Sequence, residues 1–191
     1  MAHSPYPVVL DACVLYPSLL RDLLMYLGLT GLYQPKWSAT IEDEWQRNLI
    51  KDRPDLDSDQ IRHTGELMNR ALPDAMVRGF EPLVANMDLP DVDDRHVVAA
   101  AICSDAEIIV TFNLKDFPQQ YLDNFSIEAV HPDDFITDLF DLNQALVLAA
   151  VNKQRHNMRK PPKSVEEYLD ALLRQGLPQT IKELSKFRVL I

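Results

Sequence analysis

Two short apolar runs in this chain each lead directly into polar residues. Val8–Leu10 is followed at once by Asp11, and residues 108–112 form a second run that leads to Asn113 and Asp116. Short runs without alternating polar positions are typical of strands buried on both faces, as in parallel sheets. Ligands of such sheets bind beyond the carboxyl ends of the strands. We therefore predict that Asp11, Asn113 and Asp116 meet at one edge of a parallel sheet.

Further carboxylates occur where helices are expected. Ser38 is a suitable N-cap for a helix to about residue 50, and Glu44 lies at the margin of its apolar stripe. Asp91, Asp93 and Asp94 precede an alanine-rich helix, where negative side chains interact favourably with the helix dipole. Three acids within four residues exceed what capping requires. Carboxylates that are brought together repel one another unless a cation neutralises them, and hard oxygen ligands suit Mg²⁺ or Mn²⁺.

The remaining pattern alternates between strands and helices. A leucine-rich helix is expected over about 17–27, an extended segment over 80–84 and a final strand over 125–130. This alternation indicates an α/β fold with a central parallel sheet flanked by helices. We predict one α/β domain over residues 1–142 and a helical C-terminal extension over residues 143–191.

Charge is distributed unevenly along the 191 residues. The formal net charge is −10, which combines −15 over residues 1–152 with +5 over residues 153–191. An acidic body argues against broad coating of nucleic acid, but it does not exclude a nuclease with an acidic metal site. The basic residues at the start of the extension either bind RNA or form a solvated helix end; they are Lys153, Arg155, Arg159, Lys160 and Lys163.

The cysteines and histidines show no spacing typical of metal sites. Cys13 and Cys103 both lie in apolar stretches, which fits buried free thiols in a reducing cytoplasm. The five histidines are expected to be isolated surface residues. No apolar run approaches the roughly 20 residues of a membrane-spanning helix, so no membrane association is predicted.

Four motifs together resemble PIN-domain ribonucleases, especially the VapC-type toxins of toxin–antitoxin pairs. They are Val-Leu-Asp11, Ser-x-x-Ile-x-x-Glu44, the segment Asp91-Val-Asp-Asp-Arg-His-Val-Val-Ala-Ala-Ala and the segment Ile-Val-Thr-Phe-Asn113-Leu-Lys-Asp-Phe. The resemblance spans about residues 8–117. It implies a Rossmann-like PIN fold, dependence on Mg²⁺ or Mn²⁺ and endonucleolytic cleavage of RNA. It also implies an inhibitory antitoxin protein and frequent homodimers.

The same resemblance assigns roles to individual residues. Asp11, Glu44 and Asp94 match the family's acidic metal-binding positions. Asn113 replaces a fourth aspartate of many members, so either its carbonyl oxygen binds the metal or Asp116 supplies the charge. The further candidates are Asp91 and Asp93 as alternative ligands, Thr111 as a residue that orients a ligand or water, and Arg95 and Lys115 as contacts to the scissile phosphate.

Chemistry supports the nuclease interpretation, and other functions remain open. Hydrolysis of a phosphodiester by metal-activated water needs neither a catalytic histidine nor a covalent nucleophile. A catalytically silent PIN-like binding module is one alternative. A haloacid-dehalogenase-like phosphatase is another, although its Asp-x-Asp motif would need an acid where Cys13 stands. A phosphoreceiver module would need an acidic pair that residues 8–10 lack.

Overall fold

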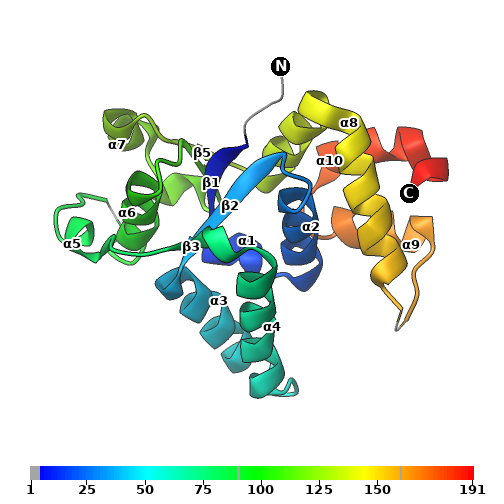
Figure 1. The fold of residues 1–191 in the computed structure, drawn as a ribbon, viewed down its shortest axis with the longest axis horizontal. Helices are drawn as coiled ribbons and strands as arrows, with labels where there is room; N and C mark the ends of the chain where they lie inside the picture. Colours follow the sequence, from blue (N-terminus) through cyan, green and yellow to red (C-terminus); the bar gives the residue numbers. More distant parts are fainter. Residues whose placement is uncertain (1–4, 90, 160) are drawn as a thin grey trace.

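Five parallel strands form the centre of the molecule in a computed structural model that describes residues 5–89, 91–159 and 161–191. The strand order is β3-β2-β1-β4-β5 (Figure 1). β1 lies between β2 and β4, so that Val9 is opposite both Lys36 and Ile109. The strands are β1 (Tyr6–Leu10), β2 (Tyr33–Ser38), β3 (Met76–Val77), β4 (Ile108–Val110) and β5 (Glu128–Val130).

Helices cover the sheet on both sides. α6 packs against β1, β2 and β4, whereas α2 packs against β2 on the other side, and the α3–α4 pair projects beyond the sheet (Figure 1). Among the described residues no helix combines the length and apolarity needed to cross a membrane. The helices are α1 (Ala12–Leu15), α2 (Ser18–Gly28), α3 (Ala39–Asp52), α4 (Ser58–Ala71), α5 (Glu81–Val84), α6 (Arg95–Cys103), α7 (Gln119–Leu122), α8 (Pro132–Asn157), α9 (Val165–Leu173) and α10 (Pro178–Leu184).

The predicted fold class, an α/β domain with a central parallel sheet and helical C-terminal region, is confirmed. Val8, Val9 and Leu10 are fully buried, as a strand covered on both faces requires. The prediction of an extended segment over 80–84 was wrong, because Glu81–Val84 forms a helical turn with Pro82 in its first turn, where proline is tolerated.

The C-terminal helices pack against the α/β core through polar as well as apolar contacts. Buried Gln154 donates from Nε2 to the carbonyl oxygen of Leu19 on α2 and accepts from the hydroxyl of Tyr168 on α9. α8 contains a non-helical residue at Asn143, beside the predicted boundary between residues 142 and 143. The division into two domains stays a prediction. Lys160 of the basic segment lies outside the described residues.

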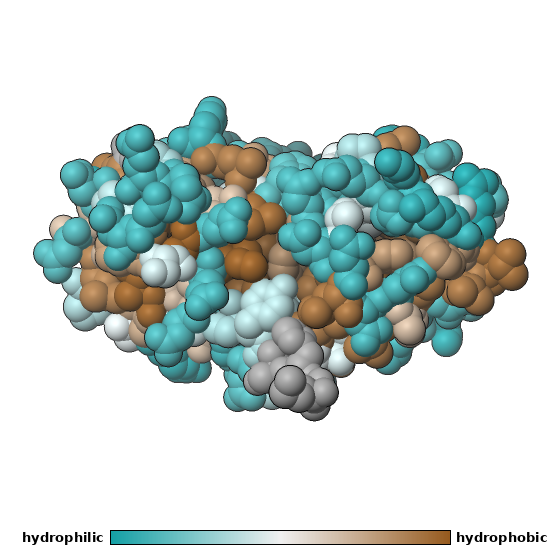
Figure 2. Space-filling view, turned by 90° about the horizontal axis from the view of Figure 1, so that it is seen from above, coloured by the Kyte–Doolittle hydropathy of each residue, from teal (hydrophilic) through white to brown (hydrophobic). Residues whose placement is uncertain are grey.

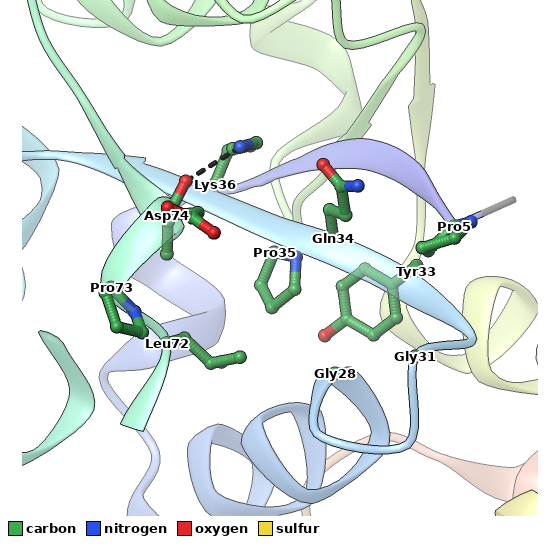
Figure 3. A pocket seen from close by; sticks show the side chains of 11 residues that line it. Pro5, Gly28, Gly31, Tyr33, Gln34, Pro35, Lys36, Leu72, Pro73 and Asp74 are labelled. Carbon is green, nitrogen blue, oxygen red and sulfur yellow. Dashed lines mark hydrogen bonds between the residues drawn. The ribbon is translucent and has the colours of Figure 1, made fainter. Parts of the chain in front are cut away.

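A hollow of about 200 Å³ lies at the amino ends of β2 and β3. Tyr33 and Pro35 line it, and the Lys36 ammonium donates to the carbonyl oxygen of Asp74 at its rim (Figure 3). The molecule viewed from above shows a mostly hydrophilic surface with apolar areas between polar side chains (Figure 2). The hollow lined by Tyr33 and Pro35 is at the amino ends of the strands, opposite to the carboxyl ends where the metal site is predicted.

Candidate metal centre

Asp11 and Thr111 meet at the carboxyl ends of β1 and β4, the sheet edge at which the sequence places Asp11, Asn113 and Asp116. Asp11 is 3% exposed and stands directly after β1, while Thr111 follows β4 and is fully buried. The Thr111 hydroxyl donates to Asp11 Oδ2 at 2.7 Å. The backbone N–H of Ala12 donates to Asp11 Oδ1 at 2.6 Å. These bonds fix the carboxylate of Asp11 at the sheet edge.

Cys13 completes the surroundings of Asp11. Its thiol donates to Asp11 Oδ2 at 3.0 Å and accepts from the backbone N–H of Phe112 at 3.3 Å. Burial, followed by the charge of Asp11, raises the pKa of the Cys13 thiol to about 12. The thiol is therefore a neutral donor to Asp11 at neutral pH, and it is not a nucleophile.

Glu44 comes from α3, and its partner was missed from the sequence. Ser38 caps this helix by accepting from the N–H of Ile41, as predicted. Glu44 Oε2 lies 3.4 Å from Nε2 of His96 on α6. The His96 side chain is only 12% exposed, so the prediction that all histidines are isolated surface residues was wrong. The two residues are far apart in sequence, and no spacing rule connects them.

Three of the other acids line an open hollow of about 460 Å³. Asp91, Val92, Asp93 and Asp116 line it. Asp91 and Asp93 are exposed, and Asp91 Oδ1 accepts from the backbone N–H of Asp93 at 2.9 Å. Asp116 and Asp94 are half-buried and lie closer to the core. The hollow therefore has acidic walls and is wide open to solvent.

The remaining candidates differ in accessibility. Asn113 and Lys115 are exposed, whereas Arg95 is half-buried and its Nη2 approaches the carbonyl oxygen of Leu89 at 3.4 Å. Thr111 is buried against Asp11, and its oxygen also accepts from the N–H of Asn113 at 3.0 Å. This geometry favours a role for Thr111 in orienting Asp11, while phosphate contacts by Arg95 and Lys115 stay predictions.

Electrostatics link the four acids that were predicted to be catalytic. Burial, followed by the charges of Asp11, Asp91, Asp116 and Glu44, raises the pKa of Asp94 to about 7. Burial also raises the pKa of Asp11, although its hydrogen bonds from Cys13 and Thr111 act in the opposite direction. The acids are thus close enough to disfavour each other's charged forms, which is the situation that a divalent cation relieves.

The donor set fits Mg²⁺ or Mn²⁺, since it consists of carboxylate oxygens, with one amide carbonyl at Asn113. Within the described part of the chain, no three His, Cys, Asp or Glu side chains are grouped closely enough to hold a metal ion. The acids therefore form an electrostatically coupled cluster and not a preformed coordination shell.

Comparison with known proteins gives two family matches that follow one another along the chain. The family described as PIN domain matches residues 7–115, and the family described as VapC50 C-terminal domain matches residues 132–186. A protein of Mycobacterium tuberculosis (strain ATCC 25618 / H37Rv), named "Putative ribonuclease VapC50", is 41% identical over 108 residues, which cover 56% of this chain and 63% of the relative. No solved structure matches the chain.

Proposed function

The chain belongs to the PIN-domain family, and on that premise we propose that it is a Mg²⁺- or Mn²⁺-dependent endoribonuclease that hydrolyses RNA phosphodiester bonds. The observation that carries the proposal is the electrostatic coupling of Asp94 to Asp11, Glu44 and Asp116 at the carboxyl edge of the sheet. Four acids gathered at one edge, with His96 beside Glu44 as the one basic side chain paired with any of them among the described residues, fit a cation site better than a purely structural role.

Each residue has a role that follows from its position. Asp11, Glu44, Asp94 and Asp116 would hold the metal, with Asn113 as a further oxygen donor and with Asp91 and Asp93, which line the open hollow, as second choices. When bound, Mg²⁺ or Mn²⁺ supplies Lewis acidity, which promotes ionisation of water and neutralises charge on the leaving oxygen.

Neighbouring residues would orient the carboxylates and the substrate. Thr111 and the N–H of Ala12 hold the carboxylate of Asp11 in one orientation, and His96 holds that of Glu44. Second partners of this kind fix metal ligands in other sites. Lys115 is exposed and close in sequence to Asp116, so its ammonium is available to a substrate phosphate.

We further propose that the protein acts as the toxin of a toxin–antitoxin pair, with RNA as substrate, an antitoxin protein as inhibitor and a homodimer as its assembly. The resemblance to VapC-type toxins and the match to a VapC50-type C-terminal domain support this role. The relative is named as a ribonuclease, and the matched stretch spans 63% of its length.

A PIN-like binding module without catalysis is the second candidate. The position of Cys13 is inconsistent with the third possibility, a haloacid-dehalogenase-like phosphatase. Its thiol, with a pKa of about 12, cannot replace the acid/base carboxyl of that class. The binding module would not need Asp11 to be held by a hydroxyl, a thiol and a backbone N–H in a strongly acidic environment.

The test is cleavage of structured and unstructured RNA by the purified protein with and without Mg²⁺ or Mn²⁺, alongside Asp11→Asn and Asp94→Asn. Metal-dependent cleavage that both substitutions abolish would support the proposal. Thermal unfolding with each metal separates the remaining cases, because a ligand of the native state raises the melting temperature. Absence of both cleavage and metal-induced stabilisation would favour the binding module.

A further inference from the structure

Arg21 on α2 is a buried arginine that none of the described carboxylates pairs with. The residue is 6% exposed, and its Nη1 donates to the carbonyl oxygen of Leu15 at 2.8 Å. The guanidinium carbon lies 4.5 Å from the centre of the Trp45 ring. Burial lowers the pKa of this guanidinium, and the charge of Asp22 only partly opposes the shift. A buried cation without an anionic partner is destabilising, so an anion bound to the Arg21 guanidinium would stabilise this part of the fold.

Arg21 and Trp45 both have N–H donors from which no described residue accepts a hydrogen bond. Arg21 Nε and Trp45 Nε1 are buried and have no hydrogen-bond partner among the described residues. Nη2 of Arg21 likewise makes no hydrogen bond to any described residue. Because Nη1 is already engaged, the free donors Nε and Nη2 lie along one edge of the planar guanidinium. That edge matches the two oxygens of a carboxylate.

A hollow of about 190 Å³ lies against these side chains, between the start of α2 and the α3–α4 pair. Leu49, Leu56 and Ile61 supply apolar walls, and Gln60 and Thr64 border it on α4. Pockets for drug-sized ligands and cofactors have volumes of about 300–1,000 Å³. The hollow is smaller and suits a single side chain with an apolar stem and a polar end.

We propose that this pocket binds the carboxylate of an aspartate or glutamate side chain presented by a protein partner. The two carboxylate oxygens accept from the Nε and Nη2 edge of Arg21, and the methylene groups contact Leu49, Leu56 and Ile61. A polyphosphate chain such as RNA is disfavoured, because it carries several negative charges, whereas Arg21 is the single cation among the described residues that line the pocket and Asp57 lines it too.

This site is separate from the metal centre, since none of the proposed metal ligands lines the pocket. The two are nevertheless joined along the chain. Trp45 follows Glu44 on α3, and the carbonyl of Leu15 that Arg21 holds ends α1, the helix that Asp11 caps. A partner seated here therefore contacts α3, which carries Glu44, and Arg21, which is hydrogen-bonded to the end of α1.

The experiment is a titration of the full chain, followed by NMR of arginine Nε–H and tryptophan indole N–H signals. The probes are acetyl-Leu-Glu-Leu-amide, its glutamine counterpart and inorganic phosphate. We expect the glutamate peptide to shift the signals of Arg21 and Trp45, with at least tenfold weaker binding of the glutamine peptide. Trp37 is the internal control, because its indole N–H already donates to Asn69.

Matched variants test the position of the site. Gln60→Phe places a ring at the pocket wall from an exposed residue and should abolish the shifts, whereas Glu66→Phe, exposed on the same helix, should preserve them. Unchanged Trp37 signals and RNA cleavage equal to wild type would show that Gln60→Phe leaves the fold and the proposed nuclease site intact. The proposal is overturned by unmoved Trp45 signals at saturating peptide, by equal binding of both peptides, or by tighter binding of phosphate.

Discussion

Two buried aspartates in this molecule have almost the same exposure and different surroundings. Asp11 is 3% exposed and Asp133 is 2% exposed. Asp133, in the first turn of α8, accepts from the backbone N–H groups of Gln179 and Thr180 at 2.8 Å each. Its carboxylate caps α10, which has no capping side chain of its own. Asp133 therefore connects two helices of the C-terminal region.

Asp11 is bonded as extensively but lies among other acids. One backbone N–H, one hydroxyl and one thiol donate to it, and the negative charge of Glu44 disfavours its charged form. A carboxylate that only had to stabilise the fold would gain nothing from these neighbours. The comparison teaches that burial and hydrogen bonding do not distinguish a structural acid from a functional one. What distinguishes Asp11 from Asp133 is the group of like charges around it.

The largest effect is expected from Asp11→Asn. The amide keeps the shape of the side chain but removes the charge that a divalent cation requires. Because even residues that merely orient metal ligands change activity by about 10- to 100-fold, loss of a ligand should reduce metal-dependent RNA cleavage by more than about 100-fold. The melting temperature without metal should change little, because the substitution removes a charge that burial disfavours but also one of the two oxygens that accept hydrogen bonds. A cleavage rate within threefold of wild type would show that Asp11 is not a metal ligand.

Asp133→Ala should give the opposite pattern, with a loss of stability and little change in the metal centre. Each hydrogen bond to a charged group contributes about 1.5–3 kcal/mol, so two of them predict destabilisation of about 3 kcal/mol or more. Urea unfolding measures the loss, and the metal-induced rise in melting temperature of the folded fraction should persist. A variant with unchanged stability would show that the N–H groups of Gln179 and Thr180 find other acceptors.

Thr111→Val sharpens the comparison at the level of a single hydrogen bond. Valine has nearly the shape of threonine, so the substitution removes the donor to Asp11 Oδ2 with little change in packing. Cleavage or metal affinity should fall by about 10- to 100-fold. Thr111→Ser, which keeps the hydroxyl, is the matched control and should retain most activity. Equal losses in both variants would indicate that packing and not the hydrogen bond matters.

The sequence predicted the sheet edge because Asp11 and the segment after Val110 directly follow buried apolar runs. Strand β2 was not predicted, since Pro35 and Lys36 interrupt any apolar pattern. Its residues are in a strand because β1 pairs with them along one side, while β3 reaches only Trp37 and Ser38 on the other. Tertiary pairing and not local propensity forms this strand.

Partners distant in sequence explain what else could not be predicted. His96 contacts Glu44 from another helix, and Asp133 caps a helix that begins at residue 178. The buried Arg21 lies in an otherwise apolar helix face, where its contact with Trp45 has no sequence signature. Asp94 could be predicted to lie near the other acids, but the extent of its coupling depends on burial that only the fold provides.

The smallest expected effect is a pH dependence of stability, measured without metal in the presence of a chelator. The native pKa of Asp94 is about 7, above its ordinary value of 3.8, so the native state holds a proton that the unfolded state releases. The stabilising contribution is complete below pH 3.8 and is lost as the pH rises through 7. The melting temperature of the metal-free protein should therefore fall between about pH 5 and pH 8, and Asp94→Asn should weaken this slope. Asp133→Asn provides the contrast, because it changes an acid outside this cluster and should leave the slope over this range as in wild type. An Asp94→Asn slope as steep as that of wild type would show that other groups dominate the titration of the metal-free protein.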